Sequence, residues 1–371
     1  MTATATPLSA AHERLLVDFR GGKPAALARV VSIVENHRPG FDAILAELHP
    51  KLGRARRIGL TGPPGAGKST LTTELTGAMR AAGLTVAVVA VDPTSPFTGG
   101  ALLGDRIRME RVALDPGVFI RSMATRGSLG GLASATREVA DVLDAFGFDR
   151  ILVETVGVGQ SELDIARTAD TSVVVLVPES GDSIQTLKAG LMEIADLFVV
   201  NKSDRPGADR LRNELELMLG MRMGAATNVP AHHGLDLRSV ADKEAVRRAM
   251  NPARAAREAA AHDGPDRWTP AVLRTVAAKG EGVDELIAAL ERHFAYLQAS
   301  GALRDRRLAR LRERVVEVVE QRVRQRIWRD AATNAWLDEH LPALASGAET
   351  PFGVADALLA RSTDLLTGTP Q

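Results

Sequence analysis

Residues 62–70 read Gly62-Pro63-Pro64-Gly65-Ala66-Gly67-Lys68-Ser69-Thr70, and they follow a short apolar segment at 58–60. The glycines let the backbone curl so that its N–H groups face phosphate oxygens, and the positive end of the following helix adds to the same field. In loops of this pattern the lysine reaches the β- and γ-phosphates and the serine hydroxyl binds Mg²⁺. Apolar residues at helical spacing continue from 71 to 79, so the pattern predicts a nucleotide-binding loop between a strand and a helix rather than a plain Gly/Pro turn.

The composition excludes several kinds of partner and of reactive site. The chain has 371 residues, with 46 basic and 46 acidic side chains and no cysteine. The charge balance gives no electrostatic reason to expect a nucleic acid or an anionic membrane as partner, and the missing cysteines exclude disulfides, thiolate metal sites and thiol nucleophiles. The first residues do not resemble a signal peptide, and no apolar run approaches ~18 residues. We therefore expect a cytoplasmic protein whose metal is bound by oxygen.

The pattern of apolar residues divides the chain into three parts. Residues 8–50 carry helical stripes and read as a helical extension. Short β-rich runs then alternate with helical segments, which is typical of an α/β fold with a mostly parallel sheet between helices. These runs are 58–60, 86–91, 151–153, 171–177, 197–200 and 272–276. Residues from 298 onward are again helical.

Carboxylates follow two of the predicted strands. Asp92 comes directly after the run at 86–91, and Glu154 directly after the run at 151–153. Open α/β sheets bind ligands beyond the carboxyl ends of their strands, and Mg²⁺ is usually held by one or two protein oxygens together with phosphates and water. Gly157, three residues after Glu154, can offer its N–H to a γ-phosphate. Asp105 could also reach the metal. Either carboxylate alone would more often be a turn cap.

A base-reading motif follows the run at 197–200, where the sequence is Asn201-Lys202-Ser203-Asp204. A carboxylate such as Asp204 accepts hydrogen bonds from N1–H and N2–H₂ of guanine, whereas adenine offers no such pair and would leave a charge unpaired. Asn201 would brace neighbouring loops, and the Lys202 stem would cover the base. The last predicted strand leads to a weaker base-contacting segment, Ala277-Ala278-Lys279, in which alanine stands where serine is usual.

Two connecting segments are unusual. Residues 93–105 form a long Gly/Pro-rich loop of the kind that closes over a ligand. Residues 121–126, followed by glycines at 127, 130 and 131, read as a mobile basic segment to which the sequence assigns no role. Lys188 lies off the apolar stripe of the helix that follows residue 178, so it is either a solvated lysine or a charge that moves toward phosphate.

Taken together, the motifs resemble the MeaB-type (ArgK-type) GTPases. These act as chaperones of adenosylcobalamin-dependent acyl-CoA mutases, chiefly methylmalonyl-CoA mutase. The resemblance is carried by motifs dense from about residue 56 to 204 and again from 272 to 286. They are Asp92-Pro93-Thr94-Ser95, Leu103-Gly104-Asp105-Arg106, Glu154-Thr155-Val156-Gly157-Val158-Gly159-Gln160, Gly181-Asp182 and Asn201-Lys202-Ser203-Asp204.

The resemblance implies a P-loop G domain related to nickel-insertion and signal-recognition GTPases, which binds GTP or GDP with Mg²⁺. It implies three switch loops, at 92–109, 154–164 and 177–188, the third coupling hydrolysis to the mutase. It implies that the chain gates transfer of adenosylcobalamin into the mutase and helps to clear inactivated cofactor. The implied metal ligands are Ser69, Asp92, Asp105 and Glu154. The implied catalytic and coupling residues are Lys68, Glu154, Asp182, Gln185 and Lys188.

These observations predict a helical extension at 1–54, a G domain at 55–297 and a C-terminal helical arm at 298–371. Apolar residues 308, 311, 315 and 318, then 319, 323 and 327, form a long stripe between arginines. The stripe predicts a homodimerisation arm, to which Trp328, Trp336 and the helix after Thr350-Pro351 would contribute, rather than a helix packed on its own G domain.

Two other functions fit part of the pattern. A P-loop phosphotransferase of the transport-kinase type would need an acceptor site beside the γ-phosphate and would preferably use ATP, which the guanine motif disfavours. A metal-insertion GTPase is disfavoured because the sequence has no cysteine and no histidine cluster.

Overall fold

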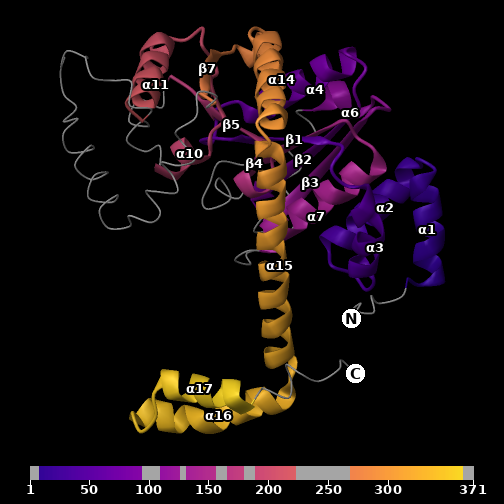
Figure 1. Cartoon of the computed structure of the whole chain (residues 1–371), viewed down its shortest axis with the longest axis vertical. Coiled ribbons are helices and arrows are strands. Elements are labelled where there is room, and N and C mark those ends of the chain that lie inside the picture. Colours follow the sequence, from indigo (N-terminus) through magenta and orange to yellow (C-terminus); the bar gives the residue numbers. More distant parts are fainter. Residues whose placement is uncertain are drawn as a thin grey trace. The chain divides into compact units, whose positions relative to one another are not determined.

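The computed structural model describes residues 8–93, 109–125, 131–155, 165–178, 189–222 and 268–361. The chain divides into two compact units, Met1–Arg304 and Asp305–Gln371. Figure 1 shows the first unit as a sheet between helices and the second as a group of helices.

The first unit is built on a seven-stranded sheet in the order β3-β2-β4-β1-β5-β6-β7, in which every described pair of strands is parallel. Parallel strands buried on both faces are apolar and β-branched, as the runs in this sequence are. The α/β fold with a parallel sheet is therefore confirmed. The strands are β1 (Arg56–Thr61), β2 (Val86–Pro93), β3 (Val118–Thr125), β4 (Arg150–Thr155), β5 (Thr171–Leu176), β6 (Leu197–Val200) and β7 (Ala271–Arg274).

One strand differs from the sequence-based expectation. The supposed mobile basic segment is wrong for residues 121–125, because they belong to β3, the edge strand that pairs along its length with β2. Arg121 does not interrupt this strand, because its guanidinium pairs with Glu35 at the end of a neighbouring helix. Residues 126–130 lie outside the described part of the chain. The last strand is also shorter than predicted, since β7 ends at Arg274 and Val276 makes only an isolated bridge with Glu281.

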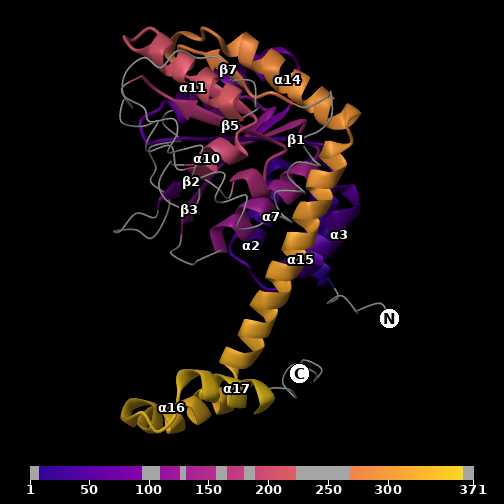
Figure 2. The same ribbon diagram turned by 60° about the vertical axis from the view of Figure 1, so that its left-hand side comes forward.

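Helices cover both faces of the sheet, which gives three layers (Figure 2). Alternate residues of each strand point to opposite faces, so Val88 and Leu152 pack on one side and Val89 and Val153 on the other. One face is covered by α4 (Lys68–Ala81), α6 (Glu110–Ala113) and α14 (Val283–Ala299). The other is covered by α7 (Gly131–Phe146), α10 (Ala189–Ile194) and α11 (Ala208–Arg222). On this side α2 (Pro24–Glu35) and α3 (Phe41–Leu48) pack on α7, and α1 (Ala10–Arg20) packs on α2.

The N-terminal helices share a core with the sheet. Leu27, Val30 and Val34 of α2 belong to the same buried cluster as Val139 of α7 and Val153 of β4. The helices α1, α2 and α3 confirm the predicted helical extension, and their burial shows that it packs against the sheet domain.

A buried carboxylate fixes the entry to β1. Asp144 of α7 accepts hydrogen bonds from the backbone N–H groups of residues 53, 54 and 55, and from the guanidinium of Arg57. Charge-assisted bonds of this kind are strong and directional. They hold the first residues of the central strand, and hence the loop at its other end, in a fixed position.

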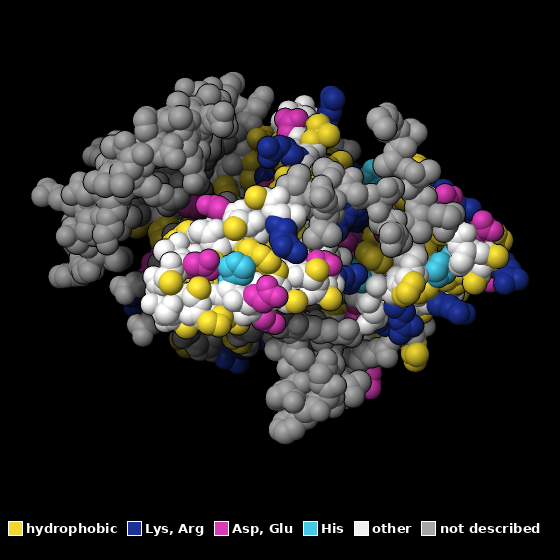
Figure 3. Space-filling view, turned by 90° about the horizontal axis from the view of Figure 1, so that it is seen from below, with side chains coloured by type: hydrophobic (Ala, Val, Ile, Leu, Met, Phe, Trp, Pro, Cys, Tyr) yellow, Lys and Arg dark blue, Asp and Glu magenta, His cyan; other side chains and the backbone are white. Residues whose placement is uncertain are grey.

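The second unit is helical, as the sequence predicts. The unit boundary falls within α15 (Ala302–Arg329), which is followed by α16 (Ala331–Ser346) and α17 (Pro351–Arg361). Asp330 caps α16 by accepting the N–H of Thr333, and α16 lies beside α17. Leu341 of α16 and Phe352 and Leu359 of α17 are exposed. Figure 3 shows hydrophobic side chains lying between charged ones on one face of the molecule. Among the described helices, none combines the length and apolar character needed to cross a bilayer.

Candidate functional site

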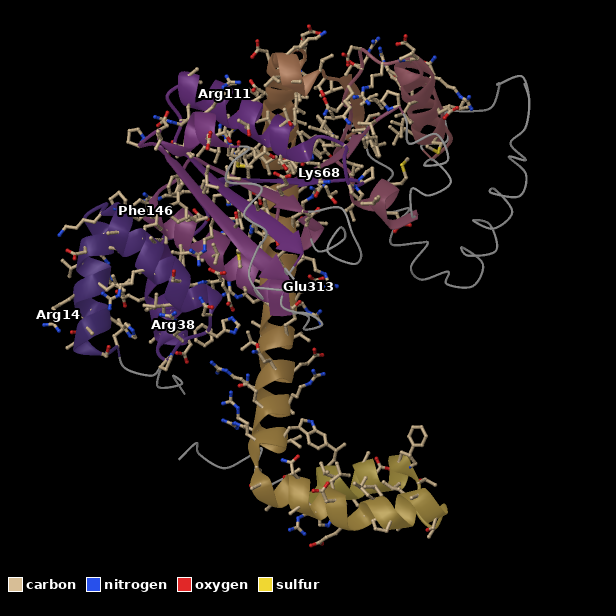
Figure 4. All side chains as sticks on the ribbon, turned by 180° about the vertical axis from the view of Figure 1, so that it is seen from behind. Arg14, Arg38, Lys68, Arg111, Phe146 and Glu313 are labelled. Carbon is tan, nitrogen blue, oxygen red and sulfur yellow. The ribbon has the colours of Figure 1, made fainter. Side chains whose placement is uncertain are left out.

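The site lies at the carboxyl edge of the sheet, where the chain leaves β1, β4, β6 and β7. Because all described strand pairs are parallel, these ends meet on one edge. The strand order also reverses direction around β1, which lies between β4 and β5, and such a switch point is where α/β sheets bind ligands. Lys68 begins α4 at this edge (Figure 4).

The loop after β1 has a shape that only glycine permits at two positions. Gly62 has φ +136° and Gly67 has φ +86°. A Cβ on Gly62 would lie 2.1 Å from the carbonyl oxygen of Val175, and one on Gly67 would lie 2.4 Å from Nδ2 of Asn201. The loop is therefore packed against the ends of β5 and β6.

The Lys68 side chain is hydrogen-bonded to the backbone of the phosphate loop. Its Nζ donates hydrogen bonds to the carbonyl oxygens of Gly62 and Pro63, at 2.9 and 3.0 Å. Its side chain is buried, so the ammonium is held within the curl of the loop. A fixed positive charge of this kind is suited to phosphate.

Glu154, at the end of β4, is joined to α4 through two hydroxyl groups. Ser69 Oγ donates to Glu154 Oε1 at 2.6 Å, and Thr72 Oγ1 lies 3.0 Å from Glu154 Oε2. The carboxylate and both hydroxyls are hard oxygen donors, the chemistry that Mg²⁺ prefers. Ser69 and Glu154 therefore fit a magnesium site by donor type and by their proximity.

Asn201 connects three loops of the site. Its Nδ2 donates to the carbonyl oxygen of Ala66 at 2.8 Å. Its Oδ1 accepts from the hydroxyl of Thr275 and from the N–H of Ala277, each at 3.0 Å. Asn201 is buried, and these bonds tie the phosphate loop to the segment after β7.

The remaining residues of the base-reading motif lie next to Asn201. Lys202 adopts a left-handed backbone conformation with φ +54° and donates from Nζ to the carbonyl oxygen of Gly65 at 2.9 Å. Asp204 is exposed, and one of its oxygens lies 3.9 Å from Nζ of Lys279. Lys279 is the last residue of a short 3-10 turn, η3 (Ala277–Lys279). The Lys279 side chain therefore reaches Asp204 from the turn at 277–279, which is compatible with base recognition by both segments.

Several predicted site residues lie outside the described part of the chain. The backbone of Asp92 belongs to β2, but its side chain is not described. Within the described ranges, no group of three or more His, Cys, Asp or Glu residues could hold a metal ion. The residues that fall outside are Asp105, Gly157, Asp182, Gln185 and Lys188.

Two contacts were not predicted from the sequence. Thr72 reaches Glu154, and Thr275 reaches Asn201. Thr72 follows Lys68 by four residues, so helical periodicity places it on the same face of α4 as the phosphate loop. That spacing is the signal that could have found it.

A parallel sheet with this loop at its switch point defines a P-loop nucleotide-binding protein. A family model described as "Methylmalonyl Co-A mutase-associated GTPase MeaB" matches residues 27–332. A putative GTPase of Pyrococcus horikoshii is 42% identical over 347 residues, covering 94% of this chain and 97% of its own. The GTPase ArgK of Escherichia coli is 37% identical over 292 residues, covering 77% and 76%.

A solved structure is similar over most of the chain. The crystal structure of an LAO/AO transport system kinase has a TM-score of 0.62 and 26% identity, covering 96% of this chain and 99% of that one. The chain belongs to the MeaB/ArgK family of methylmalonyl-CoA mutase-associated GTPases, and it is a GTPase.

Replacing Asn201 with aspartate should weaken nucleotide binding. The change keeps the acceptor for Thr275 and Ala277 but turns a donor toward the carbonyl of Ala66 into an oxygen. A buried bond replaced by repulsion costs about 1–3 kcal/mol, so we expect GDP affinity to fall by about 10-fold or more, measured by calorimetry.

The matched control is Asn36→Asp. Asn36 also donates from its amide to a backbone carbonyl, that of Ser32, but at the C-terminal cap of α2. It should leave GDP affinity unchanged. Equal GDP affinities for Asn201→Asp and Asn36→Asp would show that the hydrogen bonds of Asn201 do not support nucleotide binding.

Proposed function

We propose that this chain is a Mg²⁺-dependent GTP-binding chaperone that times the loading of adenosylcobalamin into an acyl-CoA mutase and protects or reactivates that enzyme. The observation that carries the proposal is the hydrogen-bonded unit at the strand ends, in which the phosphate loop, Glu154 and the segment Asn201–Asp204 come together within a family named for methylmalonyl-CoA mutase. Sequence similarity extends to a mouse homologue named for methylmalonic aciduria type A, which is 31% identical over 365 residues.

Guanine recognition is assigned to Asp204. Its carboxylate is exposed at the sheet edge and would accept hydrogen bonds from the donor edge of guanine. The Lys279 side chain of the turn at 277–279 reaches the carboxylate, and Lys202 is held against Gly65, so the base would lie between these segments. The predicted base contacts of Ala277, Ala278 and Lys279 belong to this proposal.

The metal site is assigned to Ser69 and Glu154, with Asp92 and Asp105 as further ligands. When bound, Mg²⁺ would neutralise negative charge that develops on the transferring phosphoryl group. The chain's own contribution is to hold Ser69 against Glu154 and to keep the Lys68 ammonium inside the phosphate loop. Both are arrangements made before the nucleotide reacts, which is how electrostatic catalysis acts.

Coupling to the mutase is assigned to the switch segments. Gly157 would lose a γ-phosphate contact on hydrolysis, and Asp182, Gln185 and Lys188 would transmit the change to the partner. A ligand can shift a conformational equilibrium only through different affinities for its states, so the GTP and GDP forms must bind the mutase differently.

The test measures the affinity of methylmalonyl-CoA mutase for this chain loaded with a non-hydrolysable GTP analogue or with GDP. Coupling between two sites is typically worth 1–3 kcal/mol, so the two affinities should differ by about 10-fold. Lys188→Ala should reduce the difference, whereas Lys51→Ala, at an exposed position of η1 (His49–Lys51), should not.

Equal affinities of both nucleotide forms would contradict the timing function. Phosphorylation of a small acceptor in preference to hydrolysis would instead support the phosphotransferase alternative.

Dimerisation is assigned to the arm at 298–371. Leu308, Leu311, Val315, Val319 and Val323 are exposed on α15 at spacings of three and four residues, which forms one apolar stripe. Exposed stripes of this kind mark interaction surfaces, and a second copy would bring an identical stripe.

Val315→Glu in the full chain should convert a dimer to a monomer, measured by light scattering, because a carboxylate would be buried in the interface. Ala309→Glu places the same charge off the stripe at an exposed position and should leave the mass unchanged. A wild-type monomer, or an unchanged mass for Val315→Glu, would contradict this assignment.

A further inference from the structure

The hydroxyl of Thr72 lies between two acceptors. Its Oγ1 is 2.9 Å from the carbonyl oxygen of Lys68, one turn earlier in α4, and 3.0 Å from Oε2 of Glu154. Thr72 is fully buried and Glu154 is 5% exposed, so water does not readily replace either contact. A hydroxyl carries one hydrogen and can donate it to only one of these oxygens at a time.

The carboxylate is the better acceptor. The Lys68 carbonyl already receives the backbone N–H of Thr72 in the regular hydrogen-bond pattern of the helix. Hydrogen bonds to an ionised oxygen are about twice as strong as bonds between neutral groups. The hydrogen of Thr72 therefore goes to Glu154.

The two carboxylate oxygens then receive hydroxyls from the same helix. Ser69 donates to Oε1 and Thr72 donates to Oε2, and the two donors are one helical turn apart. A second donor fixes the rotation of the carboxylate about its last side-chain bond, which is otherwise a soft torsion. With its hydrogen on Oε1, the Ser69 oxygen keeps its lone pairs for another ligand.

We propose that Thr72 is a positioning residue, which fixes the Glu154 carboxylate so that Ser69 presents its lone pairs to a divalent cation. This inference rests on the proposed magnesium site of Ser69 and Glu154. Residues that orient metal ligands through hydrogen bonds typically contribute 10–100-fold to metal affinity.

The helix offers a closely matched control. Thr76 is also fully buried, and its hydroxyl donates to the carbonyl oxygen of Thr72 at 2.7 Å. No described contact joins it to Glu154. Thr76→Val thus removes a buried hydroxyl that lies against the preceding turn of the same helix, as that of Thr72 does, without touching the carboxylate.

The experiment titrates Mg²⁺ into the full-length chain with a fluorescent GDP and records nucleotide binding. Thr72→Val should raise the Mg²⁺ concentration at half-saturation by about 10-fold, while the affinity for the same GDP in EDTA stays at the wild-type value. Thr76→Val should match the wild type in both measurements. A general loss of structure would lower binding with and without metal.

A second pair of variants separates loss of the hydroxyl from a general effect of the substitution on folding. Thr72→Ser and Thr72→Ala both lose the methyl group and differ only in the hydroxyl, so serine should retain the wild-type midpoint and alanine should show the shift. Equal midpoints in this pair, or equal midpoints for Thr72→Val and Thr76→Val, would overturn the inference. If GDP binding by the wild type does not respond to Mg²⁺, the proposed metal site itself is wrong.

Discussion

The parallel pairing of β1 with β4 on one side and β5 on the other is the constraint on which the site depends. Buried backbone N–H and C=O groups must be paired, and this register satisfies those of the central strand. It also sends the carboxyl ends of the strands to one edge. Glu154 therefore arrives beside Ser69, and Asn201 arrives beside Ala66, although these residues lie far apart in the sequence.

Hydrogen bonds at this edge join the loops into one unit. Glu154 links β4 to the start of α4, and Asn201 links the phosphate loop to the turn after β7. The groups proposed to contact phosphate, metal and base are consequently not independent, because each is held by a bond to another loop. A change at the γ-phosphate would then alter contacts at the end of β4, where the second proposed switch segment begins. This physical continuity supports a timing role for the nucleotide.

Much of this arrangement could be predicted from the sequence, because the motifs are short and locally determined. Six strands and the phosphate loop follow from β-branched runs and from glycines with special backbone angles. The edge strand β3 was missed because Arg121 and Ser122 interrupt its apolar run, and Arg121 is satisfied by Glu35 from a helix far away in the sequence. The contact of Thr72 with Glu154 was missed for a different reason. Its spacing from Lys68 places Thr72 on the phosphate-loop face of α4, but the sequence does not say which distant strand delivers the partner.

The strand ends are proposed to form one site that recognises guanine and holds phosphate. Calorimetric titration of the wild-type chain with GDP and with ADP, both with Mg²⁺, tests it most directly. A site built to satisfy the donors of guanine leaves a carboxylate unpaired with adenine, so ADP should bind at least about 100-fold more weakly than GDP. Equal affinities for the two nucleotides would contradict the account.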